Sequence, residues 1–580
     1  MNGTLTGLSA GMNPEEETTV HLKDAGPEDA GPEQEDAGPE DVPAPVVPEA
    51  DATEADVSEA DLDQEDQEKQ PMTGGADRAE DAPTAGGEEA AAGEERNNGS
   101  VNLKIPEEEE KEEKFTGLNK EELMKVAGTP GWVRTRWALL VVFWLGWLGM
   151  LGGAVLIILQ APRCRELPAT NWWNDGPLYQ IGDVRAFSDA RDLKGVEQKI
   201  SNLAQMKVRG LVLGPIHEAP ADQVMSLSFE KVSSESGTLD QFRSLIQAAH
   251  KKSIFVVLDL TPNYQGSSGP WFSNVSVTNV AERLKSGLVF WMNQGVDGVQ
   301  LSGVERVAGV VPSLWTDIRA IVQNGTEERP NKRVLIGVTE RSSAEDVSVL
   351  LSSTGVDLLI SRVLCPGSTD AKDATDATEL AQSVQLLYSS HNQTKLAWSL
   401  GGRAEGHLAS LVGPALVKLH QLLLLTLPGT PVINYGDEIG LMDGDTKFPR
   451  MLWDSDGKLN GTLQERSAEH LACLSFFSAL SELRGKERSL LFGDFLLLSN
   501  SSSSLAYLRV WDQSPRFLAA FNWAEDEAAV LQLSGAALPR QAAVVFSTNS
   551  SVLPVDSSVD LMELRLGPGQ AALLRFPYTG

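Results

Sequence analysis

The sequence contains few cysteines and no cluster of positive charge. Three cysteines in 580 residues cannot form the dense disulfide framework that stabilises small secreted domains. No CxxC, HExxH or other paired His and Cys spacing occurs, so we expect neither a metal site nor a bound cofactor. The net charge of -33 excludes a simple nucleic-acid-binding protein, because phosphate binding requires clustered Lys and Arg.

The negative charge is concentrated at the N-terminus. Residues 1–114 hold 34 Asp and Glu against 7 Lys and Arg, and so account for -27 of the net charge. The triplet Ala-Gly-Pro, followed by Glu, recurs at Ala25, Ala30 and Ala37, and the first aromatic residue is Phe115. Such a segment cannot bury enough apolar surface to offset chain entropy. We expect a disordered acidic tail, which either is only solvated or also serves as a docking or trafficking arm.

One uncharged apolar run, residues 137–160, is long enough to cross a membrane. At about 1.5 Å per residue, a helix of this length spans the roughly 30 Å hydrocarbon core. A core helix of a soluble domain would show a polar face, and this run has none. We therefore predict one transmembrane helix that acts as a signal anchor. Its glycines Gly146, Gly149 and Gly153 leave a shallow face, which either accepts a partner helix or reflects the abundance of glycine in membrane helices.

The flanking residues predict the orientation of this span. Residues 115–136 should form a juxtamembrane helix and linker, either on the membrane surface or as an ordinary connection. Four basic residues precede the span and two follow it, at Lys120, Lys125, Arg134 and Arg136 and then at Arg163 and Arg165. The positive-inside rule places the N-terminus in the cytoplasm, so that residues 161–177 form an extracellular neck.

Glycosylation sequons support the same orientation. Six Asn-x-Ser/Thr sequons follow the span, at Asn274, Asn324, Asn392, Asn460, Asn500 and Asn549. Six acceptors on one side of a membrane fit a glycosylated ectodomain. The sequons at Asn2 and Asn98 would face the cytosol and stay unmodified. We expect a single-pass type II protein with an extracellular C-terminal part.

Eight short apolar runs predict an α/β ectodomain. They alternate with amphipathic helical segments, which fits parallel strands that close into a (β/α)8 barrel over residues 178–489. The runs are 178–181, 210–216, 254–260, 298–302, 334–339, 357–361, 395–400 and 430–435. Five later runs with turn-rich spacers predict an antiparallel β-sandwich over residues 490–580. These runs are 492–498, 505–511, 517–522, 542–546 and 571–576.

Several motifs of the ectodomain resemble the α-amylase and α-glucosidase family. The resemblance runs from about residue 172 to the C-terminus, and it implies a barrel with an active site at the carboxyl ends of the strands. The motifs that carry it are Trp172-Trp173, Leu178-Tyr179-Gln180-Ile181, Asp259-Leu260-Thr261-Pro262-Asn263 and Asn434-Tyr435-Gly436-Asp437-Glu438.

The same resemblance implies which positions would carry catalysis, and carboxylates are missing from them. The family's nucleophilic Asp after strand four falls on Ser302, and its supporting Arg falls on Gln300. The general acid after strand five falls on Val338, with Glu340 two residues further on the same strand face. The third carboxylate falls near Gly401. Retaining glycosidases need two carboxyl groups about 5 Å apart, so we expect no enzyme.

The sequence around the span is similar to that of the heavy chains of heteromeric amino-acid transporters. Residues 114–118 and 161–168 carry this resemblance. Few residues separate Tyr264 from Asp297, so the loop domain that the related enzymes insert there is missing. Its absence favours the type of heavy chain that lacks the inserted loop domain. The resemblance implies a non-catalytic subunit that brings a multi-pass light-chain transporter to the plasma membrane. The light chain would exchange large neutral or other amino acids, and an association with integrin β subunits in adhesion signalling is also implied.

The three cysteines lie on the predicted extracellular side, so at least one of them has no internal partner. Cys164 is in the neck, next to two arginines. The heavy-chain resemblance implies that Cys164 forms a disulfide with the light chain; a free or palmitoylated thiol is the alternative. Cys365 and Cys473 lie in or beside apolar runs, and we expect buried free thiols or, alternatively, an internal pair.

Two other functions stay open from the sequence. A membrane-anchored α-glucosidase would hydrolyse a chromogenic glucoside and lose that activity when Glu340 is changed. An adhesion receptor independent of transport would support cell spreading without affecting amino-acid uptake.

Overall fold

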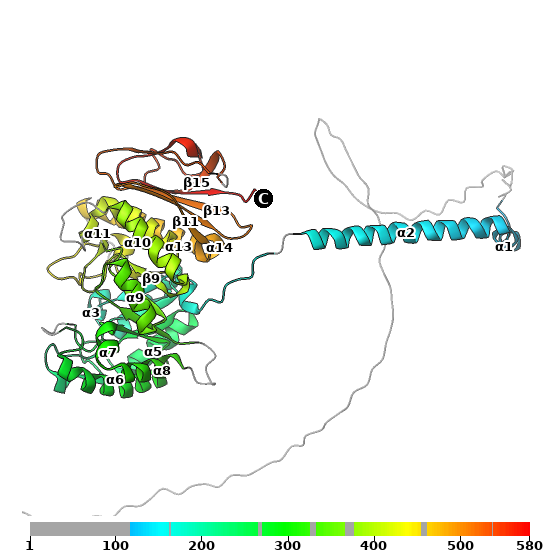
Figure 1. The fold of residues 1–580 in the computed structure, drawn as a ribbon. Helices are drawn as coiled ribbons and strands as arrows, with labels where there is room; N and C mark the ends of the chain where they lie inside the picture. The colour runs from blue at the N-terminus through cyan, green and yellow to red at the C-terminus, as the bar shows by residue number, and fades with distance from the viewer. Residues whose placement is uncertain are drawn as a thin grey trace, which may run out of the picture. The chain divides into compact units, whose positions relative to one another are not determined.

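The computed structural model describes residues 117–161, 164–264, 269–324, 332–365, 376–453, 461–535 and 538–579. Figure 1 shows these parts as coloured ribbon. The predicted acidic tail, residues 1–114, lies outside them, as does the sequon at Asn460.

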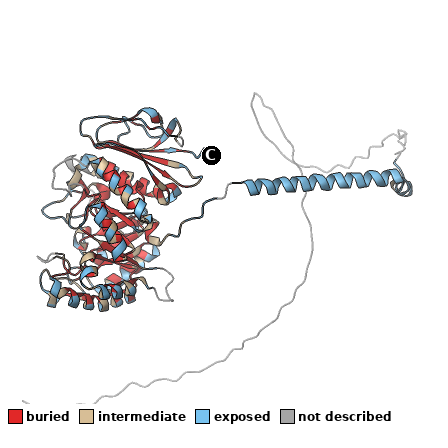
Figure 2. Cartoon of the chain, viewed as in Figure 1, coloured by how far each residue is buried: buried red, intermediate tan, exposed pale blue. Residues whose placement is uncertain are grey.

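Two helices form the N-terminal part of the described chain. Helix α1 (Lys120–Ala127) begins after Asn119, whose side chain accepts the Lys120 N–H at 2.9 Å. Helix α2 (Pro130–Gln160) has 31 residues and is exposed along its length (Figure 2). It is the one helix among the described residues that is long and apolar enough to cross a membrane. The helix begins before the predicted start at Trp137, because proline is well tolerated at a first helical position.

Eight parallel strands close into a barrel, as predicted. Each strand pairs with its neighbours in the order β1-β10-β9-β8-β7-β6-β5-β2. The strands are β1 (Leu178–Ile181), β2 (Gly210–Leu213), β5 (Phe255–Asp259), β6 (Gly298–Ser302), β7 (Val334–Val338), β8 (Leu358–Ser361), β9 (Leu396–Ser399) and β10 (Thr430–Asn434). They are short apolar runs without polar alternation because helices cover their outer face and side chains fill the interior.

Helices alternate with these strands and surround the barrel (Figure 1). They are α3 (Val184–Phe187), α4 (Leu193–Gln205), α5 (Leu239–Lys251), α6 (Asn274–Gln294), α7 (Val304–Val310), α8 (Pro312–Gln323), α9 (Ala344–Thr354), α10 (Ala377–Ser390), α11 (Leu408–Val412), α12 (Val417–Thr426), α13 (Gly461–Lys486) and α14 (Arg488–Leu491). A hairpin of β3 (His217–Glu218) and β4 (Ser228–Val232) follows the second barrel strand.

Local signals explain where several helices begin and end. Thr238 and Gln241 form a reciprocal capping box at the start of α5. Helix α6 ends at Gly295, whose φ of 100° is a left-handed conformation that glycine adopts without strain. Inside the barrel, apolar side chains form a closed layer. Its buried members are Trp173, Leu178, Val212, Val257, Val334, Ile336, Leu358, Ile360, Ala397 and Val432.

The C-terminal domain is antiparallel, as predicted. Its six-stranded sheet has the order β11-β12-β13-β18-β15-β16. The bounds are β11 (Asp494–Asn500), β12 (Ser504–Val510), β13 (Arg516–Asn522), β18 (Ala571–Phe576), β15 (Gln541–Ser547) and β16 (Ser558–Asp560). Leu505 and Tyr507 join the core that the sheet shares with the barrel, while Ala506 and Leu508 join a separate outer core. A two-stranded sheet, β14 (Ala529–Leu531) with β17 (Leu564–Leu566), contributes to that outer core and is the reduced second layer of the predicted sandwich.

Candidate functional site

The predicted catalytic positions lie at the carboxyl ends of the barrel strands, where barrels of this kind carry their sites. Ser302 is the last residue of β6 and Val338 the last residue of β7. Gly401 follows β9, and a Cβ atom added to it would be 2.6 Å from the backbone oxygen of Gly406. The backbone at this third position therefore has no room for a side chain.

Ser302 has no base that could activate it among its described partners. Its hydroxyl donates to the phenol oxygen of Tyr264 at 3.3 Å, and its N–H donates to Thr261 Oγ1 at 2.8 Å. Burial, with the nearby carboxylate of Asp259, raises the pKa of Tyr264 well above its ordinary value. A phenol that stays protonated cannot take a proton from serine, so this pair is a structural contact.

Asp259, at the end of β5, is bound by its own neighbours. Its carboxylate accepts Gln300 Nε2–H at 2.8 Å, the Thr261 N–H at 2.9 Å and the Tyr264 hydroxyl. Asp259 is 1 % exposed. The hydrogen bonds of this buried carboxylate are thus supplied by residues of the chain itself.

The position after β7 offers no buried acid. Val338 is apolar, and Glu340 is exposed to solvent. Between them, the buried Thr339 donates its hydroxyl to Glu305 Oε1 at 3.1 Å. The general acid of a glycosidase sits in a pocket beside the scissile bond, and the exposed Glu340 is not enclosed in such a pocket.

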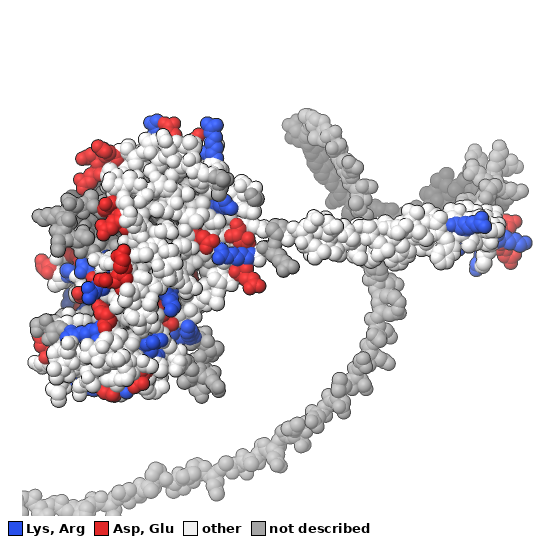
Figure 3. Space-filling model, viewed as in Figure 1, with Lys and Arg blue, Asp and Glu red and all other residues white. Residues whose placement is uncertain are grey.

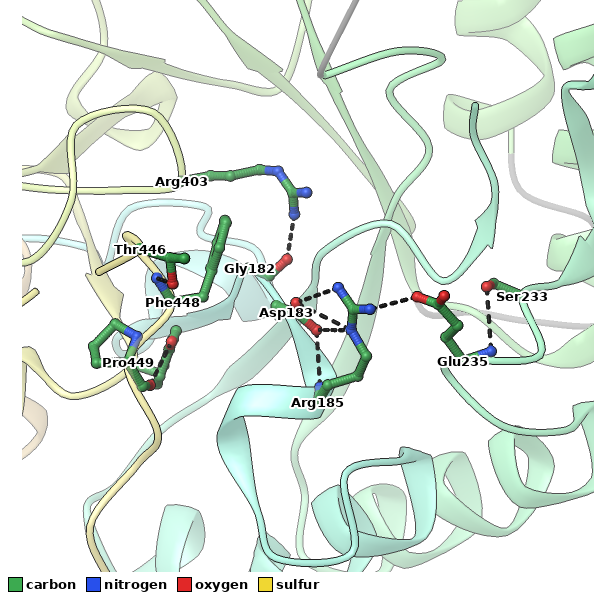
Figure 4. A network of polar contacts seen from close by, with 10 residues as sticks. Gly182, Asp183, Arg185, Ser233, Glu235, Arg403, Thr446, Phe448 and Pro449 are labelled. Carbon is green, nitrogen blue, oxygen red and sulfur yellow. Dashed lines mark hydrogen bonds and ion pairs between the residues drawn. The ribbon is translucent and has the colours of Figure 1, made fainter. Parts of the chain in front are cut away.

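Arg403 joins loops that follow three different barrel segments at the mouth of the barrel. Its guanidinium lies over the ring of Tyr264 at 4.5 Å and over the ring of Phe448 at 5.0 Å, and it donates to the Gly182 carbonyl oxygen. Figure 4 shows Arg403 directed at Gly182, beside Phe448. Burial and the charge of Arg403 lower the pKa of His217 to about 3, so His217 is neutral.

Asp183 and its neighbours form a second network at this mouth. The Asp183 carboxylate caps α3 by accepting the Arg185 N–H at 2.9 Å, and it pairs with the Arg185 guanidinium at 2.8 Å. The same guanidinium also pairs with Glu235 (Figure 4). At the entrance of the barrel, the charged side chains of Asp183, Arg185 and Glu235 are thus paired with one another.

Two buried carboxyl groups lie at the end of β10. Asp437 accepts the Leu408 N–H at 2.8 Å, and Glu438 accepts the Tyr179 hydroxyl at 2.8 Å. Burial raises the pKa of Asp437 well above its ordinary value and raises the pKa of Glu438 to about 7. Within the described ranges, no group of three or more His, Cys, Asp and Glu side chains could hold a metal ion.

The cysteines have three different environments, and none is paired with another in this chain. Cys164 is exposed in the neck. Cys365 is buried, its thiol donates to the Leu400 carbonyl oxygen at 3.5 Å, and burial raises its pKa to about 12. Cys473 is half-buried in α13, and burial also raises its pKa. Cys164 is therefore the accessible thiol.

The remaining predicted positions are accessible. Of the six sequons that follow the span, five are described, and all five asparagines are exposed: Asn274, Asn324, Asn392, Asn500 and Asn549. The glycines Gly146, Gly149 and Gly153 all lie on α2, and a Cβ atom added to any of them would meet nothing within 4 Å. On the face drawn in Figure 3, α2 carries charged side chains only near its N-terminal end.

Sequence analysis did not identify Arg403 or the partners of Arg165. Arg165 Nη1 pairs with Asp494 Oδ2 at 2.9 Å, and its backbone N–H donates to Asp512 Oδ2 at 3.1 Å. These partners are 329 and 347 residues away in the chain. No local spacing could have indicated them.

Comparison with known proteins identifies relatives of the whole chain. A family profile described as "Solute carrier family 3 member 2 N-terminus" matches residues 102–179, and one described as "Alpha amylase, catalytic domain" matches residues 180–283. The chain is 42% identical over 532 residues to the "Amino acid transporter heavy chain SLC3A2" of Oryctolagus cuniculus, covering 88% of this chain and 96% of that protein. It is 22% identical to the "Amino acid transporter heavy chain SLC3A1" of Rattus norvegicus, covering 81% and 88%.

Solved structures share the barrel fold. The trehalulose synthase MutB from Pseudomonas mesoacidophila MX-45 superposes with a TM-score of 0.56 at 16% identity, covering 70% of this chain and all of that one. At this identity the likeness shows the fold alone. The predicted resemblance to the heavy chains of heteromeric amino-acid transporters, of the type without the inserted loop domain (the 4F2 type) and with an α-amylase-like domain after the span, is confirmed by the profiles and by the sequence relatives.

Proposed function

The chain belongs to the amino acid transporter heavy chains, and from this premise we propose that it binds, stabilises and brings to the plasma membrane a disulfide-linked light-chain transporter. One apolar helix cannot form a pathway for an amino acid, so transport belongs to the partner. Binding to the folded form of the partner stabilises it by mass action. Which amino acids are exchanged, large neutral or other, is set by the light chain.

Cys164 is the proposed covalent link to the light chain. Its exposure and its place in the neck, four residues after the end of α2, support this role. The thiol of Cys164 and a thiol of the light chain form one S–S bond. Their two electrons and two protons pass to the disulfide of a protein oxidoreductase, which becomes a dithiol. The extracellular side of a membrane is an oxidising environment in which such a bond persists.

The barrel is proposed to be a scaffold without catalysis. The three positions that match the family's carboxylates are Ser302, Val338 and Gly401, and the buried Asp259 accepts three hydrogen bonds from its own neighbours. The alternative, a membrane-anchored α-glucosidase, requires hydrolysis of a chromogenic glucoside by the purified chain. Activity that disappears in Glu340→Gln would support the alternative and overturn the scaffold proposal.

The proposed topology is type II, with the tail in the cytoplasm and the barrel outside. The basic residues before the span and the exposed ectodomain sequons support it. An association with integrin β subunits in adhesion signalling rests on the resemblance alone. Its test is whether cells that lack this chain lose spreading when amino-acid uptake is restored by other means. Loss of spreading without loss of uptake would favour the adhesion receptor.

The proposed function is tested by non-reducing electrophoresis of membranes from expressing cells. The wild type should give a high-mass band that collapses on reduction, and mass spectrometry should identify a multi-pass transporter in it. Cys164→Ser should give only the monomer, while Cys473→Ser, a matched control on a half-buried thiol, should keep the band. If the wild type gives only the monomer band, the proposal of a covalently linked subunit is overturned.

A further inference from the structure

The neck is attached to the ectodomain immediately after Cys164. Arg165 makes three contacts with the C-terminal domain: with Asp494 on β11 at 2.9 Å, with Asp512 through its backbone N–H at 3.1 Å, and with the Trp511 ring, 4.6 Å from the guanidinium carbon. The neighbouring residue, Cys164, is exposed. We call Arg165, Asp494, Trp511 and Asp512 the neck clamp.

Trp511 and Asp494, on the receiving side of the clamp, also have contacts that do not involve Arg165. Trp511 is 3 % exposed and packs edge-on against Phe492. Asp494 also accepts the Tyr388 hydroxyl at 3.3 Å, through the oxygen that Arg165 does not use. Asp512 follows directly after Trp511, so its carboxylate sits on a short turn between β12 and β13. A planar guanidinium suits this arrangement, because it can stack on the indole and pair with a carboxylate together.

The clamp also limits where the ectodomain can lie. Five Cα–Cα steps lead from Gln160, the end of α2, to Arg165. At roughly 3.5 Å per step they reach at most about 18 Å. The β11 edge of the C-terminal sheet is therefore tethered close to the end of the span as long as the clamp is closed.

From these contacts we propose that Arg165 is a positioning residue: by binding Asp494, Trp511 and Asp512 it fixes the neck and presents the Cys164 thiol at one place beside the membrane. An unclamped neck would spread the thiol over a larger volume and lower its effective concentration at the partner's thiol. The proposal rests on the proposed disulfide, and its first test is independent of that disulfide.

The first test measures hydrogen exchange in the neck of the full-length chain, purified in detergent in a Cys164→Ser background. Arg165→Ala removes the ion pair with Asp494 and the cation–π contact with Trp511 together, and it should make neck amides exchange roughly tenfold faster. Asp494→Asn with Asp512→Asn removes the charges from the other side but leaves the Trp511 contact, so it should accelerate exchange by a smaller factor. Combining both sets should accelerate exchange by less than the product of the two separate factors, because both sets break the same ion pair. Exchange that is unchanged in every variant overturns the clamp, whatever the disulfide does.

The second test follows formation of the high-mass band by pulse–chase labelling in cells. Both sets of clamp variants should slow its formation severalfold, and Arg165→Lys, which keeps the charge, should restore part of the rate. Slowing by Arg165→Ala without slowing by the Asp variants would mean that Arg165 acts on the thiol directly, and would overturn positioning. If the wild type forms no high-mass band, the proposed function is contradicted. The clamp is then tested by the hydrogen-exchange measurement alone.

A matched control uses another exposed pair of the same domain. Arg540, the residue before β15, pairs at 3.1 Å with Asp560 of β16, the strand at the opposite edge of the six-stranded sheet from β11. Arg540→Ala should leave both the neck exchange and the rate of band formation unchanged. If Arg540→Ala accelerates neck exchange and slows band formation as much as Arg165→Ala does, the effect comes from removing surface charge in general. That result would overturn a specific clamp.

Discussion

Arg484 of α13 and Arg509 of β12 bind the same helix end from two different domains. Arg484 donates to the carbonyl oxygens of Leu425 at 2.7 Å and Leu427 at 3.0 Å, while Arg509 donates to that of Thr426 at 2.6 Å. Both arginines are fully buried. The last carbonyls of a helix lack partners within it, and they carry the negative end of its dipole. Two cations therefore join the barrel to the C-terminal domain through the end of α12.

Arg484→Ala should strongly destabilise the barrel and the C-terminal domain. The change leaves at least two buried carbonyl groups without a donor, at about 1–3 kcal/mol each, so the free energy of unfolding should fall by roughly 3–5 kcal/mol. Denaturant unfolding of the full-length chain, followed by tryptophan fluorescence, measures this loss. Arg540→Ala is the control, because Arg540 is exposed and its ion pair should contribute less than about 1 kcal/mol. Equal losses in the two variants would contradict the role of Arg484.

Gly401→Ala should destabilise the barrel mouth. A Cβ atom at Gly401 would lie 2.6 Å from the Gly406 backbone oxygen, which cannot move away without disturbing the Gly402–Gly406 bridge. Overpacking of this kind costs about 1–3 kcal/mol. Gly402→Ala is the matched control: its Cβ would meet only the flexible end of Glu405, at 3.0 Å. The midpoint of thermal unfolding should fall for Gly401→Ala and change little for Gly402→Ala; the reverse order would contradict this account.

Glu438→Gln should change how stability depends on pH. Burial raises the pKa of Glu438 to about 7 in the folded chain from its ordinary 4.5. The folded state therefore binds a proton more tightly than the unfolded state, and stability is lost as the pH rises from about 4.5 through about 7. The variant cannot ionise and still accepts the Tyr179 hydroxyl.

Unfolding by denaturant at several pH values measures this effect. Wild type and Glu438→Gln should have similar stability near pH 4.5, and the variant should be more stable at pH 8 by about 2–3 kcal/mol. A variant that is less stable than the wild type at pH 8 would show that Glu438 is needed as a carboxylate.

Glycosylation should follow the predicted topology. Removal of N-linked glycans from the cell-surface protein should lower its mass, and Asn→Gln changes at the five exposed sequons should each reduce that difference where the site is occupied. Changes at Asn2 and Asn98 should have no effect, because these residues precede the span. A mass difference that depends on Asn98 would contradict the type II orientation.

The barrel was predictable because its strands carry a local signal, whereas the mouth was not. Each predicted run, such as 298–302, contains a strand, since a buried parallel strand is a continuous apolar run. Boundaries moved by up to three residues: the run 210–216 ends as a strand at Leu213. The contacts of Arg403 with Tyr264 and Gly182, and those of Arg165, join loops that are far apart in sequence. Such contacts depend on the closed barrel and have no periodicity that a sequence could show.

The cysteines should differ in reactivity according to burial. A membrane-impermeant maleimide linked to polyethylene glycol needs an accessible thiolate, and burial raises the pKa of Cys365 to about 12 and also raises that of Cys473. On intact cells, the wild-type chain should carry no maleimide label before treatment with an impermeant reductant. After the treatment it should carry one label, because reduction frees Cys164. Cys164→Ser should add none in either case. Labelling of the wild type before reduction would show a free Cys164, and labelling of Cys164→Ser would show that Cys365 or Cys473 becomes accessible in the native chain.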